Sequence, residues 1–427
     1  MKISLARTFV YFFIIWFALT LILATKIPSA YKRIYAEDGV SLQQSLESSF
    51  PNELFEPMSG YLDFLLRVIA SIVSIFPLEF ASLIFFGANT LFLAILWASV
   101  YISSINLFKN RRWRFFAATS LILIPIGNFE SLANAANLHF YFMSASLVVI
   151  LAQPRNGLEA FLLSSIVFLA ATSIPLMILT FPLVITRLSL SQFRPKNVKD
   201  KTIILSWILG NSIQAFFIMT TSLGERKSTS VNSISEVAYL YLDRVVGSSL
   251  IPFWGFVSTS TQLPFPHLFN KTTFLLIRAI FTICMIMLFL ILIKRVSGLT
   301  STQNRMCFVV VFTGIFQWIF VGLLFNPEPR YAIFPSFSLL IALFYAVQHK
   351  SAQNLRLDLL VIILVVLTWV GSWAPSKIRT EGPYWNTELK KARATCFGVA
   401  QKVSIPISPN SSSWQITIDC NYVLNSD

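Results

Sequence analysis

The chain has 427 residues, of which 55% are hydrophobic and only 12% are charged, and its formal net charge is +14. Soluble domains carry about a quarter charged residues, so this composition excludes an ordinary soluble protein and predicts a polytopic membrane protein. The excess of Lys and Arg does not indicate nucleic-acid binding, because these residues punctuate the apolar segments, as topology signals do.

Apolar segments recur along the whole chain, and Lys2 and Arg7 precede the first of them. The small-residue cleavage pattern after this segment is poor, which favours an uncleaved anchor over a secretory signal. We expect about eleven transmembrane helices, at residues 9–24, 78–105, 115–126, 138–151, 162–173, 176–185, 203–222, 273–293, 307–324, 331–347 and 359–373.

The basic residues predict the orientation of these helices. With the N-terminus in the cytoplasm, the basic stretches at residues 109–114, 187–201, 294–305 and 350–356 all fall inside. Most of the acidic residues then lie on the outer face, where we expect the chemistry. The protein is therefore expected to be a multi-pass protein of the cytoplasmic membrane with an extracytoplasmic C-terminus.

Residues 61–76 decide how many times the chain crosses. Asp63 and Arg67 stand four positions apart, on one face of a helix. We interpret the segment as an amphipathic helix on the outer surface. The alternative is a short transmembrane helix, which would reverse the orientation of everything after it.

The C-terminal residues change character and predict a small folded tail. Polar residues increase after residue 373, and alternating apolar residues at 402–405 and 414–418 are typical of strands. We expect a helix at residues 387–398 followed by a β-hairpin that rests on the outer loops. Cys396 and Cys420 can form a disulfide in an oxidising compartment.

The predicted architecture is an all-α membrane domain at residues 1–373 and an α/β extracytoplasmic tail at residues 374–427. The outer loops of the membrane domain are expected at residues 25–77, 127–137 and 223–272. Polar side chains suited to chemistry gather in these loops and at the head of a later helix, and they are Glu37, Asp38, Glu130, Asn134, Asn137, His139, Arg244, Arg330 and Tyr331.

These residue types suit the transfer of a sugar from an anionic donor. A carboxylate can deprotonate a sugar hydroxyl, or polarise it through a metal ion. A guanidinium can bind two phosphate oxygens at once, and amides and aromatic rings suit a sugar.

The chain resembles the GT-C superfamily of integral-membrane glycosyltransferases, in a poorly characterised bacterial branch. The likeness lies in the architecture and in four short motifs, which are Ala36-Glu37-Asp38-Gly39, Ser59-Gly60-Tyr61 with Arg67, Asn134-x-x-Asn137-x-His139 and Pro329-Arg330-Tyr331. The resemblance implies a polyprenyl-phosphate sugar donor and transfer to a glycan, lipid or protein acceptor of the cell envelope on the outer face of the membrane.

The resemblance also implies roles for residues. Asp38, and after it Glu37, would be the catalytic base or a metal ligand. Arg330, and after it Arg67 or Arg244, would bind the donor phosphate. Glu130, Asn134, Asn137, His139 and Tyr331 would bind substrate. Family members often have two aspartates at the first position, and this chain has Glu-Asp, so dependence on a divalent cation, Mg²⁺ or Mn²⁺, stays open.

Other interpretations remain at this point. Glu37 and Asp38 can be a solvated loop or a helix cap, Arg330 an interfacial anchor, and Asn134 and Asn137 helix caps. A transporter or flippase for a lipid-linked or small anionic substrate is a second function class, which the prolines at positions 175 and 182 favour. A non-catalytic scaffold for envelope assembly is a third.

Overall fold

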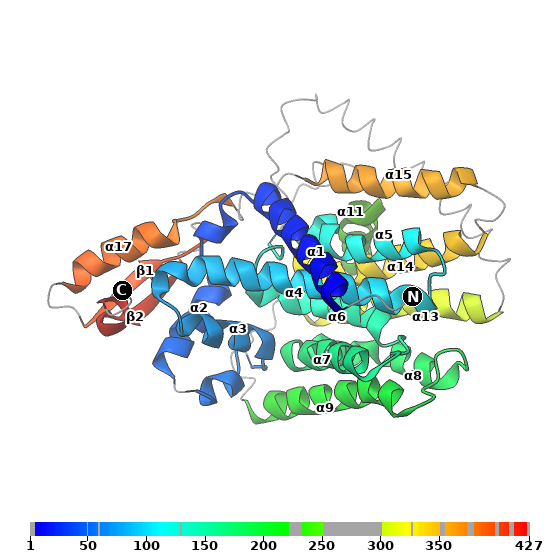
Figure 1. The fold of residues 1–427 in the computed structure, drawn as a ribbon, viewed down its shortest axis with the longest axis horizontal. Helices are drawn as coiled ribbons and strands as arrows, with labels where there is room; N and C mark the ends of the chain where they lie inside the picture. Colours follow the sequence, from blue (N-terminus) through cyan, green and yellow to red (C-terminus); the bar gives the residue numbers. More distant parts are fainter. Residues whose placement is uncertain are drawn as a thin grey trace.

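The computed structural model describes residues 5–48, 50–58, 60–128, 130–221, 233–250, 301–325, 328–350, 355–373, 380–397, 401–409 and 414–424. The fold is mainly helical, with one two-stranded sheet near the C-terminus (Figure 1). The expected span at residues 273–293 and the greater part of the expected loop 223–272 lie outside the described residues.

Most of the helices pack against one another in a bundle. In chain order they are α1 (Leu5–Lys26), α4 (Ala81–Ser103), α5 (Arg111–Leu123), α6 (Leu138–Val149), α7 (Gly157–Ser173), α8 (Phe181–Ser189), α9 (Val198–Thr220), α13 (Ser301–Leu324), α14 (Ile333–Lys350) and α15 (Leu355–Gly371). Every residue of α6 is buried, so this helix forms the centre of the core. The short helices α10 (Ile234–Tyr241), η9 (Leu242–Gly247) and α11 (Ser248–Leu250) precede α13.

Four helices in the described residues are long and apolar enough to cross a membrane: Leu78–Asn106, Val198–Thr220, Asn304–Leu324 and Pro329–Gln348. Six further apolar helices are shorter, at 10–17 residues. The membrane-like helical character that the sequence predicts is therefore present. Several of the expected spans are short, and the described residues do not confirm eleven transmembrane helices.

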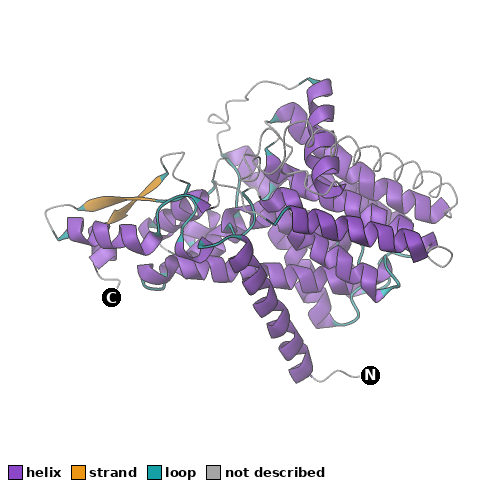
Figure 2. Ribbon diagram, turned by 90° about the horizontal axis from the view of Figure 1, so that it is seen from above, coloured by secondary structure: helices purple, strands orange, loops and turns teal. Residues whose placement is uncertain are grey.

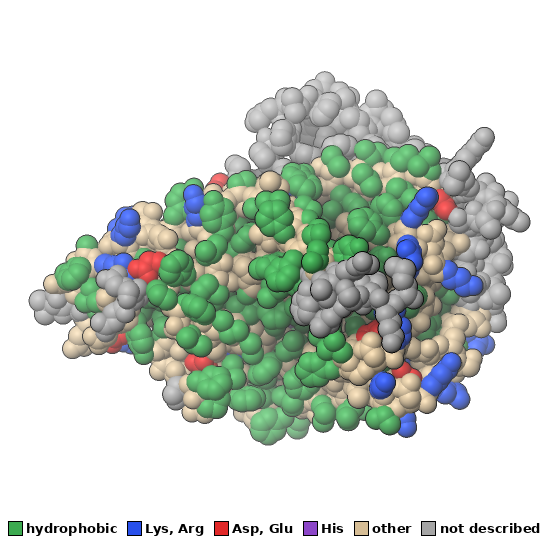
Figure 3. Space-filling model, in the orientation of Figure 1, with side chains coloured by type: hydrophobic (Ala, Val, Ile, Leu, Met, Phe, Trp, Pro, Cys, Tyr) green, Lys and Arg blue, Asp and Glu red, His purple; other side chains and the backbone are tan. Residues whose placement is uncertain are grey.

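The surface of the bundle is largely hydrophobic. Side chains such as Phe17, Phe216 and Val370 are more than half exposed, on helices α1, α9 and α15 respectively. Figure 3 shows hydrophobic side chains over the middle of one face, with Lys and Arg toward its two ends. This distribution is what a bilayer requires of a protein surface, because lipid solvates apolar side chains and water solvates charges.

The expected first outer loop folds into short helices, which are η1 (Ala30–Lys32), α2 (Ala36–Glu47), η2 (Asn52–Phe55) and α3 (Phe64–Ser74). The amphipathic helix predicted at residues 61–76 corresponds to α3, which has 11 residues. At about 1.5 Å per residue it is roughly 16 Å long, half of what the hydrocarbon core of a bilayer requires. Helices α6 and α8 are about as short, with 12 and 9 residues, so the choice between an interfacial and a transmembrane α3 stays a prediction.

The tail contains α17 (Trp385–Cys396), β1 (Lys402–Pro406), β2 (Gln415–Asp419) and α18 (Cys420–Leu424). The strands are antiparallel, and Val403 pairs with Ile418 on the buried side. Cys396 and Cys420 are disulfide-bonded, with their Cα atoms 5.4 Å apart. The prediction of a short helix followed by a β-hairpin is confirmed, although the helix begins and ends two residues earlier than expected.

The tail packs against the first-loop helices at one end of the molecule (Figure 2). Ser408 forms a backbone bridge with Tyr35, in which its N–H donates to Ile34 O at 3.0 Å and its carbonyl accepts from Ala36 N at 2.6 Å. The indole of Trp385 donates to Leu78 O at 2.6 Å. These bonds fix the position of Ala36, which begins the helix that carries Glu37 and Asp38.

Candidate active site

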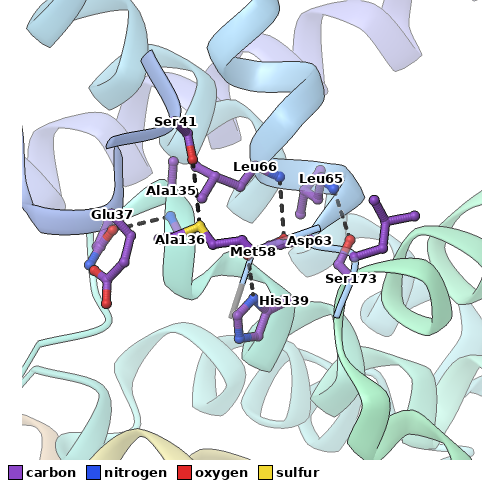
Figure 4. Close-up of polar contacts among 12 residues, drawn as sticks. Glu37, Ser41, Met58, Asp63, Leu65, Leu66, Ala135, Ala136, His139 and Ser173 are labelled. Carbon is purple, nitrogen blue, oxygen red and sulfur yellow. Dashed lines mark hydrogen bonds and ion pairs between the residues drawn. The ribbon is translucent and has the colours of Figure 1, made fainter. Parts of the chain in front are cut away.

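A buried imidazole and a buried carboxylate meet where α3 faces the first turn of α6. Asp63 is the N-cap of α3, where its Oδ1 accepts from Leu66 N at 3.4 Å. Its other oxygen, Oδ2, lies 3.2 Å from Nδ1 of His139 (Figure 4). Both side chains are almost fully buried. A carboxylate on one ring nitrogen of a histidine fixes the orientation of the ring and directs the other nitrogen elsewhere.

The backbone on both sides of Asp63 is held by two neighbouring helices. Gln214 of α9 accepts from Leu62 N at 3.1 Å and donates to Leu62 O at 3.0 Å. Ser173, the last residue of α7, accepts from Leu65 N at 2.9 Å (Figure 4). Three hydrogen bonds from two elements therefore determine where the Asp63 carboxylate lies.

Asp38 holds the turn that leads into α6. Its carboxylate is buried and accepts from Ala136 N at 2.8 Å and from Ala135 N at 3.3 Å. These amides begin η6 (Ala135–Asn137), which continues directly into α6. Amides at the start of a helix have no partner within the helix, and an ionised carboxylate stabilises them. Asn134 caps the same turn by accepting from Ala136 N at 3.1 Å.

The backbone near this contact adopts an unusual conformation on both sides. Ala36 has φ +36° and Ala133 has φ +58°. Residues other than Gly, Asn and Asp seldom adopt positive φ angles. Strained backbone of this kind persists where the surrounding structure imposes it, and it is enriched at functional sites. Here it brings the acidic pair of α2 against the start of η6.

A charged cluster forms around Arg330, which lies in η11 (Pro329–Ala332) at the head of α14. Its Nη1 is 3.7 Å from Glu130 Oε1 and 3.9 Å from Glu37 Oε1, and its Nη2 pairs with Glu328. Each of these side chains is partly exposed. Three carboxylates around one guanidinium leave the cluster with a net negative charge.

Arg244 and Arg67, the other two arginines expected at the donor phosphate, lie in different surroundings. Burial lowers the pKa of Arg244, and the charges of Asp243 and Glu328 act in the opposite direction, so this arginine lies near the Arg330 cluster. Arg67 is fully buried, and its Nε donates to Glu56 O at 3.1 Å. Its Nη1 donates to Gln44 Oε1 at 2.6 Å. Arg67 therefore connects two parts of the first loop by hydrogen bonds.

A cavity of about 430 Å³ is lined in part by His139. Its walls are mainly apolar, with Ile178 from η7 (Pro175–Thr180), Ile218 from α9 and Phe320 from α13. The polar side chains of its lining belong to Tyr61, His139 and Tyr331. Large, mainly apolar pockets with a few convergent polar groups are typical ligand sites.

No group of three or more His, Cys, Asp and Glu side chains in the described residues is arranged to hold a metal ion. The carboxylates of Glu37, Glu130 and Glu328 converge on the Arg330 guanidinium instead of on one another. This cluster, as it stands, does not fit a divalent cation.

The structure thus brings together several residues that the sequence singled out. Glu37, Glu130 and Arg330 form one cluster, Asp38 and Asn134 share one helix start, and His139 and Tyr331 line one cavity. Asn137 is buried in η6, and Arg67 does not line the cavity. The sequence pattern placed Asp63 with Arg67 on one helix face and did not indicate its contact with His139, although its position just before an apolar helix was a usable signal of a capping residue.

A scan against models of known protein families finds none that matches this chain, and a search of curated proteins finds no significant match.

Proposed function

We propose that this protein is a membrane glycosyltransferase that transfers a sugar from a polyprenyl-phosphate donor to an envelope glycan, lipid or protein on the outer face of the cytoplasmic membrane. The observation that carries this proposal is the mainly apolar cavity that His139, Tyr61 and Tyr331 line, because a lipid-linked donor needs an apolar groove beside polar groups.

The prenyl chain of the donor would occupy the cavity between η7, α9 and α13. Ile178, Ile218 and Phe320 offer it apolar contacts, and burial of apolar surface contributes about 25 cal/mol per Å². The short, Pro-containing helices beside the cavity leave room for a ligand where a continuous helix would fill the space.

The phosphate of the donor would lie at the polar side chains of the cavity. His139, oriented by Asp63, can donate to a phosphate oxygen through its other ring nitrogen when both ring nitrogens carry a proton, and the tyrosines Tyr61 and Tyr331 can donate hydrogen bonds. Arg330 precedes Tyr331 directly, with its guanidinium 5.8 Å from the Tyr331 ring, and would bind the departing phosphate by exchanging one of its carboxylate partners for a phosphate oxygen.

Glu37 is the better supported catalytic base of the acidic pair. Its side chain is 26% exposed, whereas Asp38 is 3% exposed and accepts two backbone amides. In the proposed step the acceptor oxygen attacks the anomeric carbon, its proton passes to Glu37, and the bond from that carbon to the phosphate oxygen breaks. The leaving group is polyprenyl phosphate, which takes the bonding electrons. Asp38 positions the start of η6 and, with it, His139.

The proposed orientation keeps the N-terminus in the cytoplasm and the tail outside. Lys199 and Lys201 at the start of α9, and Arg111, Arg112 and Arg114 at the start of α5, would face the cytoplasm. The tail and the Glu37 cluster would share the opposite, outer side. A disulfide in the tail supports this orientation, because disulfides persist in oxidising compartments.

Donor binding can be tested with a benzophenone-bearing farnesyl phosphate on the purified protein in nanodiscs. We expect photocrosslinks to cavity residues near Ile178 and Phe320, with competition by undecaprenyl phosphate but not by the uncharged prenol. Equal competition by the prenol would contradict a phosphate site at His139.

Sugar transfer can be tested in membranes supplied with a panel of radiolabelled polyprenyl-phosphate sugars. Glu37→Gln should abolish the transfer seen with the wild-type protein. Glu47→Gln is a matched control, because Glu47 ends the same helix α2 and pairs at the surface with Lys402. Normal transfer by Glu37→Gln would exclude Glu37 as the base.

A flippase for a lipid-linked substrate is the second candidate, favoured by the interrupted helices beside the cavity. Helix α7 ends at Ser173, six residues of 3₁₀-helix follow, and α8 begins at Phe181. Discontinuous helices often line transporter sites. Movement of a fluorescent prenyl phosphate between leaflets, without any sugar transfer and without an effect of Glu37→Gln, would favour this function.

A further inference from the structure

A second groove lies at the other end of α9, away from the candidate active site. It has a volume of about 420 Å³ and is bounded by the end of α8, the connection that follows it and the first half of α9. Leu188, Leu205 and Ile208 line the groove and are each about half exposed. The groove is open to the surroundings of the bundle.

The residues of α9 in this groove form a single stripe. Lys201, Ile204, Leu205 and Ile208 are spaced by three, four and seven positions, which places them on one helix face. The stripe starts with a charge in the first turn and continues with apolar side chains along the helix axis. Since α9 is one of the helices long enough to cross a membrane, this stripe runs in the direction of a lipid chain.

The mouth of the groove is positively charged. Arg194 and Lys201 both line the groove, and the Nε of Arg194 donates to Leu188 O at 3.1 Å, which holds the guanidinium in place. Neither side chain forms an ion pair with a described acid. The neighbouring Asp200 is buried, and its Oδ2 accepts from Lys196 N at 2.8 Å, so its carboxylate is directed to the capping of α9.

We propose that this groove binds an anionic glycerophospholipid. The headgroup phosphate would lie between Arg194 and Lys201, and an acyl chain would follow Ile204, Leu205 and Ile208 along α9. A basic pair beside an apolar groove complements such a lipid, since basic residues near a membrane surface attract anionic headgroups and apolar side chains contact acyl chains. The inference rests on the membrane location of α9 and not on the proposed sugar transfer.

The experiment compares two double variants that lose the same charge from the same segment. Arg194→Gln with Lys201→Gln removes the charges at the groove, and Lys196→Gln with Lys199→Gln removes exposed charges that do not line it. Binding of phosphatidylglycerol and of phosphatidylcholine with identical acyl chains is measured by native mass spectrometry of the purified full-length protein.

We expect the wild-type protein and the Lys196/Lys199 variant to retain phosphatidylglycerol in preference to phosphatidylcholine. The Arg194/Lys201 variant should lose at least tenfold in apparent affinity for phosphatidylglycerol. An equal loss in both variants would show general surface attraction and overturn the proposal. Equal binding of phosphatidylcholine to the wild-type protein would overturn it as well.

A third variant tests the acyl chain without a change of charge. Leu205→Trp would fill the groove and should reduce retention of phosphatidylglycerol, whereas unchanged retention would overturn the predicted path of the acyl chain. Glycerol 3-phosphate should not compete with the lipid at equal concentration. Competition of equal strength would show a site for free phosphate esters, not for a lipid.

Discussion

The carboxylate of Asp63 and the imidazole of His139 lie 3.2 Å apart although 76 positions separate them in the chain. Asp63 serves two elements, because one oxygen caps α3 and the other holds the first turn of α6. The contact therefore links the amphipathic helix of the first loop to the most buried helix of the core, beside the apolar cavity.

Substitutions of Asp63 should separate its two tasks. Asp63→Asn keeps an oxygen to accept from Leu66 N, and its NH2 can donate to Nδ1 of the neutral imidazole in the other tautomer, so we expect a melting temperature close to that of the wild-type protein. Asp63→Ala removes the cap, at a cost of about 1 kcal/mol, and leaves a buried ring nitrogen without its partner. Thermal unfolding in detergent measures both variants, and equal destabilisation by Asn and Ala would contradict a role based on hydrogen bonding.

Substitutions of Asp38 should distinguish positioning from catalysis. Asp38→Ala leaves buried amides of η6 without an acceptor, which should destabilise the protein by about 1–3 kcal/mol. Asp38→Asn still offers an oxygen to Ala136 N and should retain most of the sugar transfer. The melting temperature of each variant and its rate of sugar transfer are measured on the same membrane preparation. If Asp38→Asn folds normally but is inactive, Asp38 is the base, as the sequence motif first predicted, and our assignment of Glu37 is wrong.

A side chain at Gly39 should destabilise the protein, because the buried side chain of Ile407 in the tail packs against this position. A Cβ at this position would clash with Cδ1 of Ile407 and approach Ile34 and Ile416 to within 3.3 Å. We expect Gly39→Ala to cost about 1–3 kcal/mol through overpacking and to raise the protease sensitivity of the tail. Gly87→Ala in α4 is the control, since a Cβ there meets open space, and it should leave the cleavage rate unchanged.

The bond between Cys396 and Cys420 should stabilise the tail. In the chain-entropy model, a disulfide that closes a loop across 24 positions adds about 3 kcal/mol to the free energy of unfolding. Reductant should therefore accelerate limited proteolysis of the tail in the wild-type protein. The Cys396→Ser/Cys420→Ser variant should be cleaved quickly with or without reductant. If reductant still accelerated cleavage of the tail in this variant, the effect in the wild-type protein would not come from this disulfide, and the prediction would be wrong.

The proposed orientation predicts which surface positions a membrane-impermeant thiol reagent reaches in intact cells. Lys402→Cys in the tail should be labelled from outside, whereas Lys199→Cys at the start of α9 should be labelled only after permeabilisation. Cys284 and Cys307 are replaced by Ala in both variants. Labelling of both positions from the same side would contradict the proposed topology.

Much of the local structure followed from the sequence. Apolar runs predicted where helices form, and alternation predicted the two strands of the tail, because both patterns depend on neighbours close in the chain. The sequence also predicted the amphipathic helix after the first apolar segment and the pairing of Cys396 with Cys420. Helix lengths were harder to predict, since an apolar run does not define where a helix ends when tertiary packing buries a turn beside it.

The sequence by itself determined that this chain is rich in apolar helices, that acidic residues cluster beyond the first of them, and that Glu37, Asp38 and His139 are candidates for chemistry. Only the tertiary structure decided which of these side chains point to a shared space. Asp38 is turned toward the amides of η6, Arg67 is buried in the first loop, and Asp63 meets His139. The physical reason is that hydropathy and capping are local properties, whereas the partner of a buried charge depends on how distant helices pack.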